Sequence, residues 1–581
     1  MFLAVTADQR FWKKDEKIFF LGEWCRIFSQ EQVWSKLSHE VFPYHWENRD
    51  KYYQDFLVLD DVYERCLEQL SESLNILHNE DWSTRRWRII IGPWLYYFIE
   101  IFYDRYFSIR TAIDSGKVSK TWIPSQAPDK CVPKDFTTFQ TWHCEDGYNQ
   151  YLYGWLIRAL GGISYEVKDA DLQLSQSKFF QKAFKKNLAR FGRLIPKDLN
   201  KIIFVSSYLK PRDLLRMQIS LGQLPIPCTP WPETKDVLPD LEMRKKISLL
   251  LGRNEFETLL NELIPLQIPA VYIEGYAEMR QVAHSSFPRK PEVIFSLNAL
   301  YANEGFKFWA ADQVEGGVKL IGGQHGGHYG CSLWSTNESH EAKVADRYYT
   351  WGWEDADHPK KIPFASGQLA GTNRSIGFDS NGGILWLGLS RPRYSSWTFS
   401  APVGLQMLEY VESQMVFLEK LLREPRDLLI MRLFPADFGW EVQKRLSRRF
   451  PDLYFDSKEK TMYQQLCRSR LCIGTYNATT NLETLSANFP TIAFWDFDHW
   501  KLRESAKPYF DDMREVGIFH DNPESAAIKV NEVYEDPLSW WNSKIIKEAR
   551  NRFCHRFART SENWIFEWKQ EFQRLSASRK L

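Results

Sequence analysis

Residues 471–496 read LCIGTYNATTNLETLSANFPTIAFWD, and this stretch decides the predicted fold of the 581-residue chain. An apolar run at 471–476 leads into a small polar turn, a helical stretch at 480–488 and a second apolar run at 490–495. The same alternation extends upstream, with strands expected at 384–390, 427–434 and 453–455 and helices at 401–423, 440–449 and 459–469. Strands and helices repeated at this short spacing predict a doubly wound parallel α/β sheet.

The first 360 residues mix further strand patterns with long helical stretches. Apolar runs predict strands at 2–7, 17–25, 201–207, 291–298 and 347–353, a helix at 306–315, and a strand that starts at 318 and runs into a glycine-rich loop. Residues 89–99 are a continuous uncharged stretch, shorter than the about 20 residues that cross a membrane, and they predict a buried helix. Helices are also expected at 149–160 and 180–193, whereas 113–146 reads as a long surface connection.

A polar segment rich in Gly and Ser at 360–382 marks the expected boundary between two α/β lobes. The fold class predicted is therefore α/β, with two Rossmann-like lobes facing a cleft and a first lobe elaborated with helices. The first lobe spans 1–375 and the second 380–535, and the stretch that follows is helical and rich in Trp and Phe.

Composition and charge narrow the classes of function. Lys and Arg number 75 against 74 Asp and Glu, and this balance argues against a dedicated nucleic-acid binder. Nine scattered cysteines without a Cys-x-x-Cys pair indicate reduced thiols. The N-terminus lacks the pattern of a secretory signal. We therefore expect a cytoplasmic protein without a transmembrane segment.

The segment 321–330, IGGQHGGHYG, is the richest candidate site. Five glycines follow a strand, and glycine lets the backbone approach a ligand closely. At the carboxyl end of a parallel strand this is where α/β proteins place ligands. The loop residues expected to contact substrate are Gly323, Gln324, Gly326 and Gly327, beside the histidines His325 and His328. A tight turn with incidental histidines is one alternative, and a zinc site formed by His325, His328 and His340 with Glu338 or Glu341 is another.

The second candidate site is the polar turn and helix after the strand at 471–476. Asn477, Thr479 or Thr480 could cap the helix, and a helix N-terminus is a ready site for phosphate. Glu483 lies about one turn inside the helix, where a carboxylate can accept hydrogen bonds from ribose hydroxyls. An ordinary capped helix with an exposed glutamate is the alternative.

Three arginines form the third candidate feature. Arg391 and Arg393 follow the strand at 384–390, and Arg432 lies near the end of the strand at 427–434. All three are expected at the same carboxyl edge of the sheet, where arginine suits bidentate binding of phosphate or carboxylate. Each alone could equally be a surface charge.

Several segments carry a resemblance to a known family. They are FLGEWC (20–25), PYHWENR (43–49), GPWLYY (92–97), YDRY (103–106), GGQHGGHYG (322–330), DRYYTWGW (346–353), MRLFPADFGW (431–440) and YNATTNLETLSANFPTIAFWD (476–496). Together they resemble a family of transferases encoded in bacterial surface-polysaccharide (O-antigen) gene clusters. More distantly, the second lobe is similar to that of GT-B glycosyltransferases.

The resemblance implies roles for particular residues. In GT-B enzymes a polar turn, a helix with an internal Glu and a following Pro hold the nucleotide, and here Thr479, Thr480, Glu483 and Pro490 match. The glycine-rich loop is similar to loops in bacterial sialic-acid, Kdo and polyol-phosphate transferases, whose first-lobe histidine lies near the reacting centre; that role falls on His325. The other catalytic candidates, expected to assist His325, are His328, Glu338 and Glu341. Neither a metal nor a cofactor is expected.

The resemblance also implies an organisation and a reaction. Lobe 1–375 would take the acceptor, lobe 380–535 the nucleotide, and helices in 536–581 would pack back on the first lobe. The predicted function is a glycosyltransferase that moves a sugar, with a preference for a CMP-activated ulosonic or sialic-type acid, onto a bacterial surface polysaccharide. The alternatives are a nucleotide-sugar epimerase, a CDP-polyol phosphotransferase, and a non-catalytic glycan-binding or assembly protein.

The C-terminal stretch 541–581 suggests a further partner. It carries ten Lys and Arg against four Asp and Glu, with Trp564, Phe566, Trp568 and Phe572 between them. These residues could dock on an anionic membrane that holds a lipid-linked glycan acceptor. A packed helix with a basic solvent face is the alternative. The expected partners are thus a nucleotide-sugar donor, a glycan or lipid-linked glycan acceptor and peripheral contact with the inner membrane, without nucleic acid.

Overall fold

The computed structural model describes residues 1–125, 127–175, 199–226, 230–396 and 398–577. The helix expected at 180–193 lies outside these residues. The chain divides into two compact units. Unit 1 comprises Met1–Ser206, Ile226–Leu320 and Pro392–Thr398, and unit 2 comprises Ser207–Pro225, Ile321–Arg391 and Phe399–Leu581. The boundaries expected from the sequence, near 375–380 and 535, stay a prediction.

Unit 1 contains a five-stranded parallel sheet. Its strands are β1 (Phe2–Ala4), β2 (Ile18–Phe20), β3 (His39–Val41), β4 (Lys120–Pro124) and β5 (Ser164–Lys168), in the order β3-β2-β1-β4-β5. A second parallel pair in this unit joins β6 (Ile202–Val205) to β7 (Val293–Ser296). The strands expected near 2–7, 17–25, 201–207 and 291–298 all form, because each is a short apolar run that can be buried on both faces.

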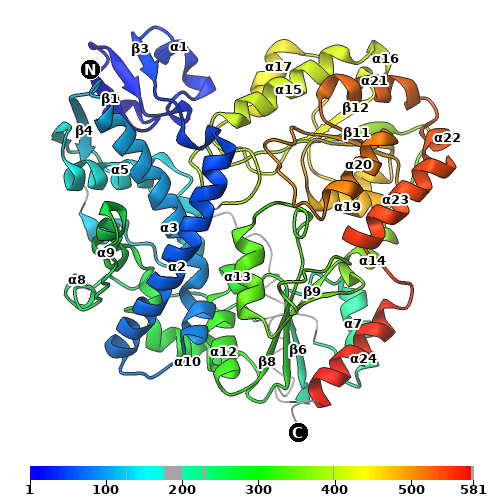
Figure 1. Cartoon of the computed structure of the whole chain (residues 1–581), viewed down its shortest axis with the longest axis horizontal. Helices are drawn as coiled ribbons and strands as arrows, with labels where there is room; N and C mark the ends of the chain where they lie inside the picture. The colour runs from blue at the N-terminus through cyan, green and yellow to red at the C-terminus, as the bar shows by residue number, and fades with distance from the viewer. Residues whose placement is uncertain (126, 176–198, 227–229, 397, 578–581) are drawn as a thin grey trace. The chain divides into compact units, whose positions relative to one another are not determined.

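Unit 1 contains two long helices, α2 and α3, and several shorter ones. They are α1 (Glu31–Trp34), α2 (Arg49–His78), α3 (Thr84–Asp114), α4 (Phe136–Trp142), α5 (Asp146–Leu160), α8 (Leu241–Arg244), α9 (Glu255–Gln267), α10 (Tyr276–Ser286), α11 (Ala299–Ala302) and α12 (Glu304–Glu315). Helices α2 and α3 lie side by side (Figure 1). The expected buried helix at 89–99 is the middle of α3, where every residue is buried.

The expected surface connection at 113–146 is wrong. Residues Lys120–Pro124 form β4, which pairs with both β1 and β5 inside the sheet. Phe136 and Phe139 of α4 are fully buried. The alternation in Lys-Thr-Trp-Ile-Pro is only five residues long and ends in proline, so its strand pattern is hidden by the polar residues on both sides.

Unit 2 contains the sheet that the opening sequence stretch predicts. Its strands are β11 (Gly383–Leu387), β12 (Leu429–Arg432), β13 (Ser469–Gly474), β14 (Thr491–Phe494) and β15 (Phe519–His520), all parallel, in the order β12-β11-β13-β14-β15. The core includes Leu385, Leu387 and Cys472 from the strands, packed with Leu466 and Phe489. The short strand expected at 453–455 is reduced to one isolated parallel bridge between Met431 and Phe455.

A second group of parallel strands belongs to the same unit. It consists of the last three residues of β8 (Lys319–Gly323), β9 (Arg347–Thr350) and β10 (Lys361–Pro363). The glycine-rich loop follows β8 directly. The parallel strands in both units confirm the predicted α/β fold class.

The helices of unit 2 cover its strands and form the end of the chain. They are α7 (Pro211–Ser220), α13 (Thr336–Val344), α14 (Gly367–Asn373), α15 (Gln406–Lys420), α16 (Arg423–Asp427), α17 (Val442–Arg449), α18 (Met462–Leu466), α19 (Thr479–Ser486), α20 (Lys507–Glu515), α21 (Pro523–Val533), α22 (Pro537–Trp541), α23 (Lys544–Phe557) and α24 (Trp564–Ala577). Helix α24 lies beside α7 and α14 (Figure 1).

The aromatic residues of α24 are mostly inside the fold. Trp564, Trp568 and Phe572 are buried, and the indole nitrogen of Trp568 donates to the carbonyl oxygen of Ala365 at 2.9 Å. Phe566 alone of the four predicted membrane-contact rings is exposed. Packing therefore accounts for three of the four rings, and contact of 541–581 with a membrane stays a prediction. In the part of the chain that is described, none of the helices combines the length and hydropathy that a bilayer crossing requires.

Candidate functional site

The glycine-rich loop after β8 is anchored by a buried glutamine. The side-chain oxygen of Gln324 accepts hydrogen bonds from the backbone nitrogen of Trp351 at 2.9 Å and the indole nitrogen of Trp353 at 2.7 Å. Its amide nitrogen donates to the carbonyl oxygen of Gly326 at 2.9 Å. These bonds fix the loop to the chain after β9, so Gln324 supports the site, and its predicted contact with substrate stays a prediction.

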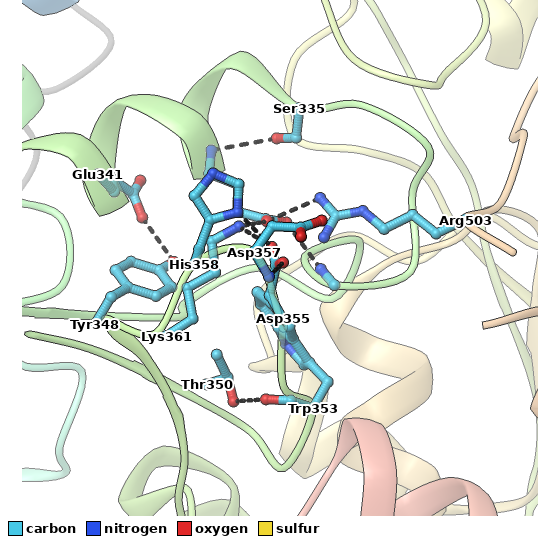
Figure 2. Close-up of polar contacts among 12 residues, drawn as sticks. Ser335, Glu341, Tyr348, Thr350, Trp353, Asp355, Asp357, His358, Lys361 and Arg503 are labelled. Carbon is cyan, nitrogen blue, oxygen red and sulfur yellow. Dashed lines mark hydrogen bonds and ion pairs between the residues drawn. The ribbon is translucent and has the colours of Figure 1, made fainter. Parts of the chain in front are cut away.

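His325 is paired with a buried carboxylate. Its Nε2 lies 2.9 Å from Oε1 of Glu341, which also accepts a bond from the Tyr329 hydroxyl at 2.9 Å. Oε2 of Glu341 accepts from the Tyr348 hydroxyl at 3.0 Å (Figure 2). A carboxylate at Nε2 favours the tautomer protonated there and makes Nδ1 the basic nitrogen. The imidazole is thereby oriented as a general base would be.

His328 has a different environment. Its Nε2 lies 3.2 Å from the Ser335 hydroxyl, and its ring packs against Tyr329 and Phe399. Burial lowers the pKa of His328 to about 3. The imidazole therefore stays neutral at physiological pH and can act through hydrogen bonds, but it is a weak base.

Glu338 is held by two cations. Its Oε1 accepts from Lys361 Nζ at 2.9 Å and Arg503 Nη2 at 2.8 Å, and its Oε2 accepts from the backbone nitrogen of Gly330 at 2.9 Å. Lys361 also bonds Asp355 at 2.8 Å (Figure 2). Burial by itself raises the pKa of Glu338, but the charges of Arg503 and Lys361 lower it to about 2. Because it stays ionised at neutral pH, its contacts fasten the end of the glycine-rich loop.

The two sequence motifs meet in unit 2. The backbone nitrogen of Gly327 donates to the hydroxyl oxygen of Thr479, the first residue of α19, at 3.0 Å. A Cβ atom at position 327 would collide with the backbone of Ala478 and Thr479, so only glycine allows this approach. The side-chain nitrogen of Asn477, a buried residue, donates a hydrogen bond to the Cys331 sulfur at 3.3 Å. The structure thus places the histidine loop directly on the N-terminus of α19.

The expected capping of α19 differs in detail. Its N-cap is Ala478, which offers no side-chain bond to the helix, so Asn477, Thr479 and Thr480 do not cap it. Thr479 instead bonds the glycine-rich loop, and the Thr480 hydroxyl lies 3.6 Å from the sulfur of Met462. A Cβ atom at position 474 would collide with the Asn481 side chain, so glycine is required at the end of β13. The N-cap side chain therefore does not bond the first backbone N–H groups of α19, which are the groups that a phosphate would use.

Glu483 lies inside α19 and is buried, contrary to the exposed alternative. Its Oε1 accepts a bond from the Tyr463 hydroxyl at 2.8 Å. Burial raises the pKa of Glu483 to about 7, against the lowering effect of Tyr463 and of the Lys210 ammonium. A buried carboxyl group that titrates near neutral pH is a frequent feature of functional sites.

The three predicted arginines have separate sets of contacts. Arg393 belongs to unit 1, where it bonds the carbonyl oxygen of Trp24 and the Asp146 carboxylate. Arg432 at the end of β12 forms an ion pair with Asp456. The guanidinium of Arg391 lies 4.4 Å from the ring centre of Phe399, the ring that also packs on His328. Arg391 is the member of the three that the structure brings toward the histidine loop.

The zinc alternative is not supported. Among the described residues, no three His, Cys, Asp or Glu side chains form a group that could hold a metal ion. His325 is directed to Glu341, and Glu338 is occupied by Lys361 and Arg503.

Sequence reasoning missed several residues of this region. The Tyr208 ring is parallel to the His325 ring, with centres 5.8 Å apart. The Lys210 ammonium bonds the Ser375 hydroxyl and lies 5.2 Å from the ring centre of Tyr463. Tyr208 and Lys210 follow the predicted strand at 201–207, and their position after a parallel strand was the signal that could have found them. Nothing in the sequence around Tyr463 points to its contact with Glu483.

The fold and this site define an α/β protein of parallel sheets with a candidate ligand site beyond the ends of its strands. The chain belongs to the LIC12162 family of transferases, whose family model matches residues 1–572. It is therefore a transferase. A search of curated proteins finds no match.

Solved structures with distant similarity to this chain include the following three proteins. The UDP-forming α,α-trehalose-phosphate synthase of Burkholderia vietnamiensis is 11% identical, with a TM-score of 0.31 over 53% of this chain and 77% of that chain. An α-glucosyltransferase in complex with UDP and mismatched DNA is 14% identical, with a TM-score of 0.30 over 49% of this chain and 79% of that one. Anabaena Alr3699/HepE in complex with UDP is 13% identical, with a TM-score of 0.29 over 65% of this chain and all of that one.

Proposed function

We propose that this transferase is a glycosyltransferase of the GT-B type that moves a sugar from a nucleotide donor onto a bacterial surface polysaccharide. The observation that carries the proposal is the hydrogen bond of 3.0 Å between Gly327 and Thr479. It brings a histidine with an oriented imidazole beside a helix N-terminus suited to phosphate. Activation of an acceptor hydroxyl and release of a nucleotide call for a base and a phosphate-binding group within one site.

In this proposal α19 binds the donor nucleotide. The backbone N–H groups of Thr479 and Thr480 stabilise the leaving phosphate, where negative charge develops as the sugar departs. Arg391 adds a positive charge on the same side. Glu483 accepts hydrogen bonds from the ribose hydroxyls, which replace the bond that Tyr463 now supplies.

His325 acts as the general base. The acceptor hydroxyl oxygen attacks the anomeric carbon while the bond between that carbon and the phosphate oxygen breaks. The hydroxyl proton passes to Nδ1 of His325, and Glu341 stabilises the imidazolium that forms. His328, neutral because of its burial, positions the reacting groups by hydrogen bonding.

The finer parts of the proposal concern substrates and organisation. The donor we favour is a CMP-activated ulosonic or sialic-type acid, whose carboxylate gives a cationic site a second group to bind. The acceptor would bind to residues 1–375 and the nucleotide to residues 380–535. The helices of residues 536–581 would pack on the segment 1–375. The acceptor would be a glycan or a lipid-linked glycan, reached by peripheral contact with the inner membrane from the cytoplasm.

A thermal-shift panel with CMP, CDP, UDP, GDP and dTDP tests the proposal. A nucleotide that binds only the native state raises stability by about 2.7 kcal/mol at a hundredfold excess over its Kd. We expect one nucleotide to do so, with the shift reduced in Glu483→Gln and kept in Glu504→Gln, a control at a glutamate whose side chain is 86% exposed.

The outcomes separate the alternatives. A CMP-selective shift supports the donor we favour, whereas a UDP, GDP or dTDP shift keeps glycosyl transfer and discards that donor. A CDP-selective shift favours polyol-phosphate transfer. Release of an epimerised nucleotide sugar without acceptor would indicate the epimerase, and no shift at all would contradict nucleotide binding and favour a glycan-binding protein.

A further inference from the structure

Tyr208 combines two features that core packing does not explain. The residue is 46% exposed, although it is aromatic. Its φ of 56° lies in the left-handed region, which is costly for a bulky side chain, and Ser206 two residues before has a φ of 49°. The described chain has six non-glycine residues with positive φ, and two of them fall within these three positions. Strained backbone of this kind persists only where surrounding structure holds it.

The strained backbone places the Tyr208 ring against the candidate base. The rings of Tyr208 and His325 are 3° from parallel, with centres 5.8 Å apart. Because nearly half of Tyr208 remains accessible, a ligand beside His325 could contact this residue. A flat aromatic face is suited to the apolar C–H face of a pyranose ring.

The chain after Tyr208 is firmly held, so the ring has a fixed support. The carbonyl oxygen of Lys210 accepts bonds from the backbone nitrogens of Asp213 and Leu214 at 2.9 Å and thereby starts α7. Asp213 in turn accepts from Arg374 at 2.6 Å. The Tyr208 ring, which we call the platform, is therefore attached to the start of a hydrogen-bonded helix.

Lys210 supplies a positive charge beside the platform. Its ammonium bonds the Ser375 hydroxyl and lies over the ring of Tyr463, the residue that bonds Glu483. The charged groups that act on this ammonium are Asp213, Arg374 and Glu483. One short segment thus presents an aromatic face at His325 and a cation near Glu483.

We propose that Tyr208 and Lys210 form the subsite for the transferred sugar and select a pyranose ring that carries a carboxylate. The Tyr208 face stacks on the ring, and the Lys210 ammonium pairs with its acidic group. The inference rests on the proposed function and names the substrate class of the same site. It makes Tyr208 and Lys210 specificity-determining residues.

Saturation-transfer NMR with free sugars tests the subsite without any nucleotide. The full-length protein is mixed with N-acetylneuraminate, an acidic pyranose, or with neutral methyl glucoside. We expect transfer to the ring protons of N-acetylneuraminate only. The affinity obtained from a titration of this signal should fall at least about fivefold in Tyr208→Ala, which corresponds to about 1 kcal/mol. The signal should persist in Tyr208→Phe and in the control Tyr165→Ala, a tyrosine on β5 that is 45% exposed.

Two further variants keep the test decisive. Tyr208→Leu retains apolar bulk but lacks the aromatic face, so it should keep the fold and lose the signal as Tyr208→Ala does. Lys210→Met should weaken N-acetylneuraminate binding about tenfold through the lost charge. No signal with wild-type protein, an unchanged signal in Tyr208→Ala and Tyr208→Leu, or equal signals from the acidic and neutral sugars would overturn the proposal.

Failure of this inference is distinguishable from failure of the proposed function. The nucleotide thermal shift should be the same in Tyr208→Ala and in wild-type protein, because α19 is untouched. With an identified donor, Tyr208→Ala should raise KM and leave the pH profile of kcat unchanged. A fall in kcat with a displaced pH profile and an unchanged KM would show that Tyr208 only positions His325, and the subsite would be rejected.

Discussion

Glu338 on α13 and Glu483 on α19 are both almost fully buried, yet the structure treats them in opposite ways. Glu338 receives Lys361, Arg503 and a backbone N–H, and its pKa falls to about 2. Glu483 accepts one hydrogen bond, from the Tyr463 hydroxyl, and feels the charge of Lys210 at longer range. Burial raises the pKa of Glu483 to about 7. The sequence places Glu483 inside an expected helix and Glu338 shortly after the glycine-rich loop, and it does not show that their environments differ.

The difference lies in how fully each carboxylate is compensated by partners inside the protein. The carboxylate of Glu338 has a full set of internal partners, so its work is to hold the loop that carries His325. The Glu483 carboxyl is poorly compensated, and a ligand that supplies hydroxyl donors would stabilise its charged form. Four predictions test this contrast, from the largest expected effect to the smallest.

Replacing Glu338 by Gln should have the largest effect on stability. The change leaves Arg503 without its carboxylate partner and Lys361 with Asp355 alone, and breaking a buried ion pair costs about 3–5 kcal/mol. Urea unfolding would measure the loss, with Glu504→Gln as the exposed control. A change below about 0.5 kcal/mol, typical of surface substitutions, would show that Glu338 does not fasten the loop.

Replacing Glu483 by Gln should change how stability depends on pH. The folded pKa of about 7 lies above the ordinary 4.5, so the native state binds the proton more tightly than the unfolded chain. Stability from this group is complete below pH 4.5 and is lost as pH rises through 7, an amount of about 3 kcal/mol. Glu483→Gln should lack this loss and exceed wild type at pH 8. Parallel pH profiles of unfolding for the two proteins would contradict the assignment.

Adding one methyl group at Gly327 should separate the histidine loop from α19. The Cβ of Gly327→Ala would meet backbone atoms of Ala478 and Thr479, and overpacking of this kind costs about 1–3 kcal/mol. Differential scanning calorimetry would give the loss, and the nucleotide-induced thermal shift should fall with it. Gly252→Ala, where a Cβ meets nothing within 4 Å, is the control. If both variants behave alike, the contact between loop and helix is not important.

Removing the Tyr463 hydroxyl should have the smallest effect. The phenol donates to Glu483 and favours its charged form, so Tyr463→Phe should raise the pKa of Glu483 above 7. One such hydrogen bond contributes about 1 kcal/mol. The measurement is the pH midpoint of the stability difference between each protein and its Glu483→Gln counterpart. A midpoint that moves down would mean that the phenol does not support the carboxylate.

Much of the fold of unit 2 could be predicted because its strands and helices are short, apolar and regularly spaced. The loop at 321–330 and the helix at 479–486 were also visible, since glycines, histidines and a polar turn mark them locally. The contact between the loop and the helix could not be predicted, because Gly327 and Thr479 are 152 residues apart in the sequence. Long-range pairing also explains Arg393, which meets Asp146, 247 residues earlier.

Two other features were hidden for local reasons. Strand β4 is five residues long and ends in proline, so polar neighbours mask its pattern. Tyr208 depends on a backbone with positive φ at a tyrosine, which no sequence preference indicates. Burial and partner sets, which distinguish Glu338 from Glu483, are properties of the packed chain.

Turnover of donor sugars by His325→Asn tests the central claim most directly. Release of nucleotide from CMP-, UDP-, GDP- and dTDP-sugars would be followed with and without a polysaccharide acceptor, for wild type, His325→Asn and the control His358→Asn, whose side chain is 63% exposed. Removal of a general base predicts a loss of about 10²–10⁴ in kcat for His325→Asn, with an unchanged nucleotide thermal shift. A His325→Asn protein as active as wild type would contradict the account.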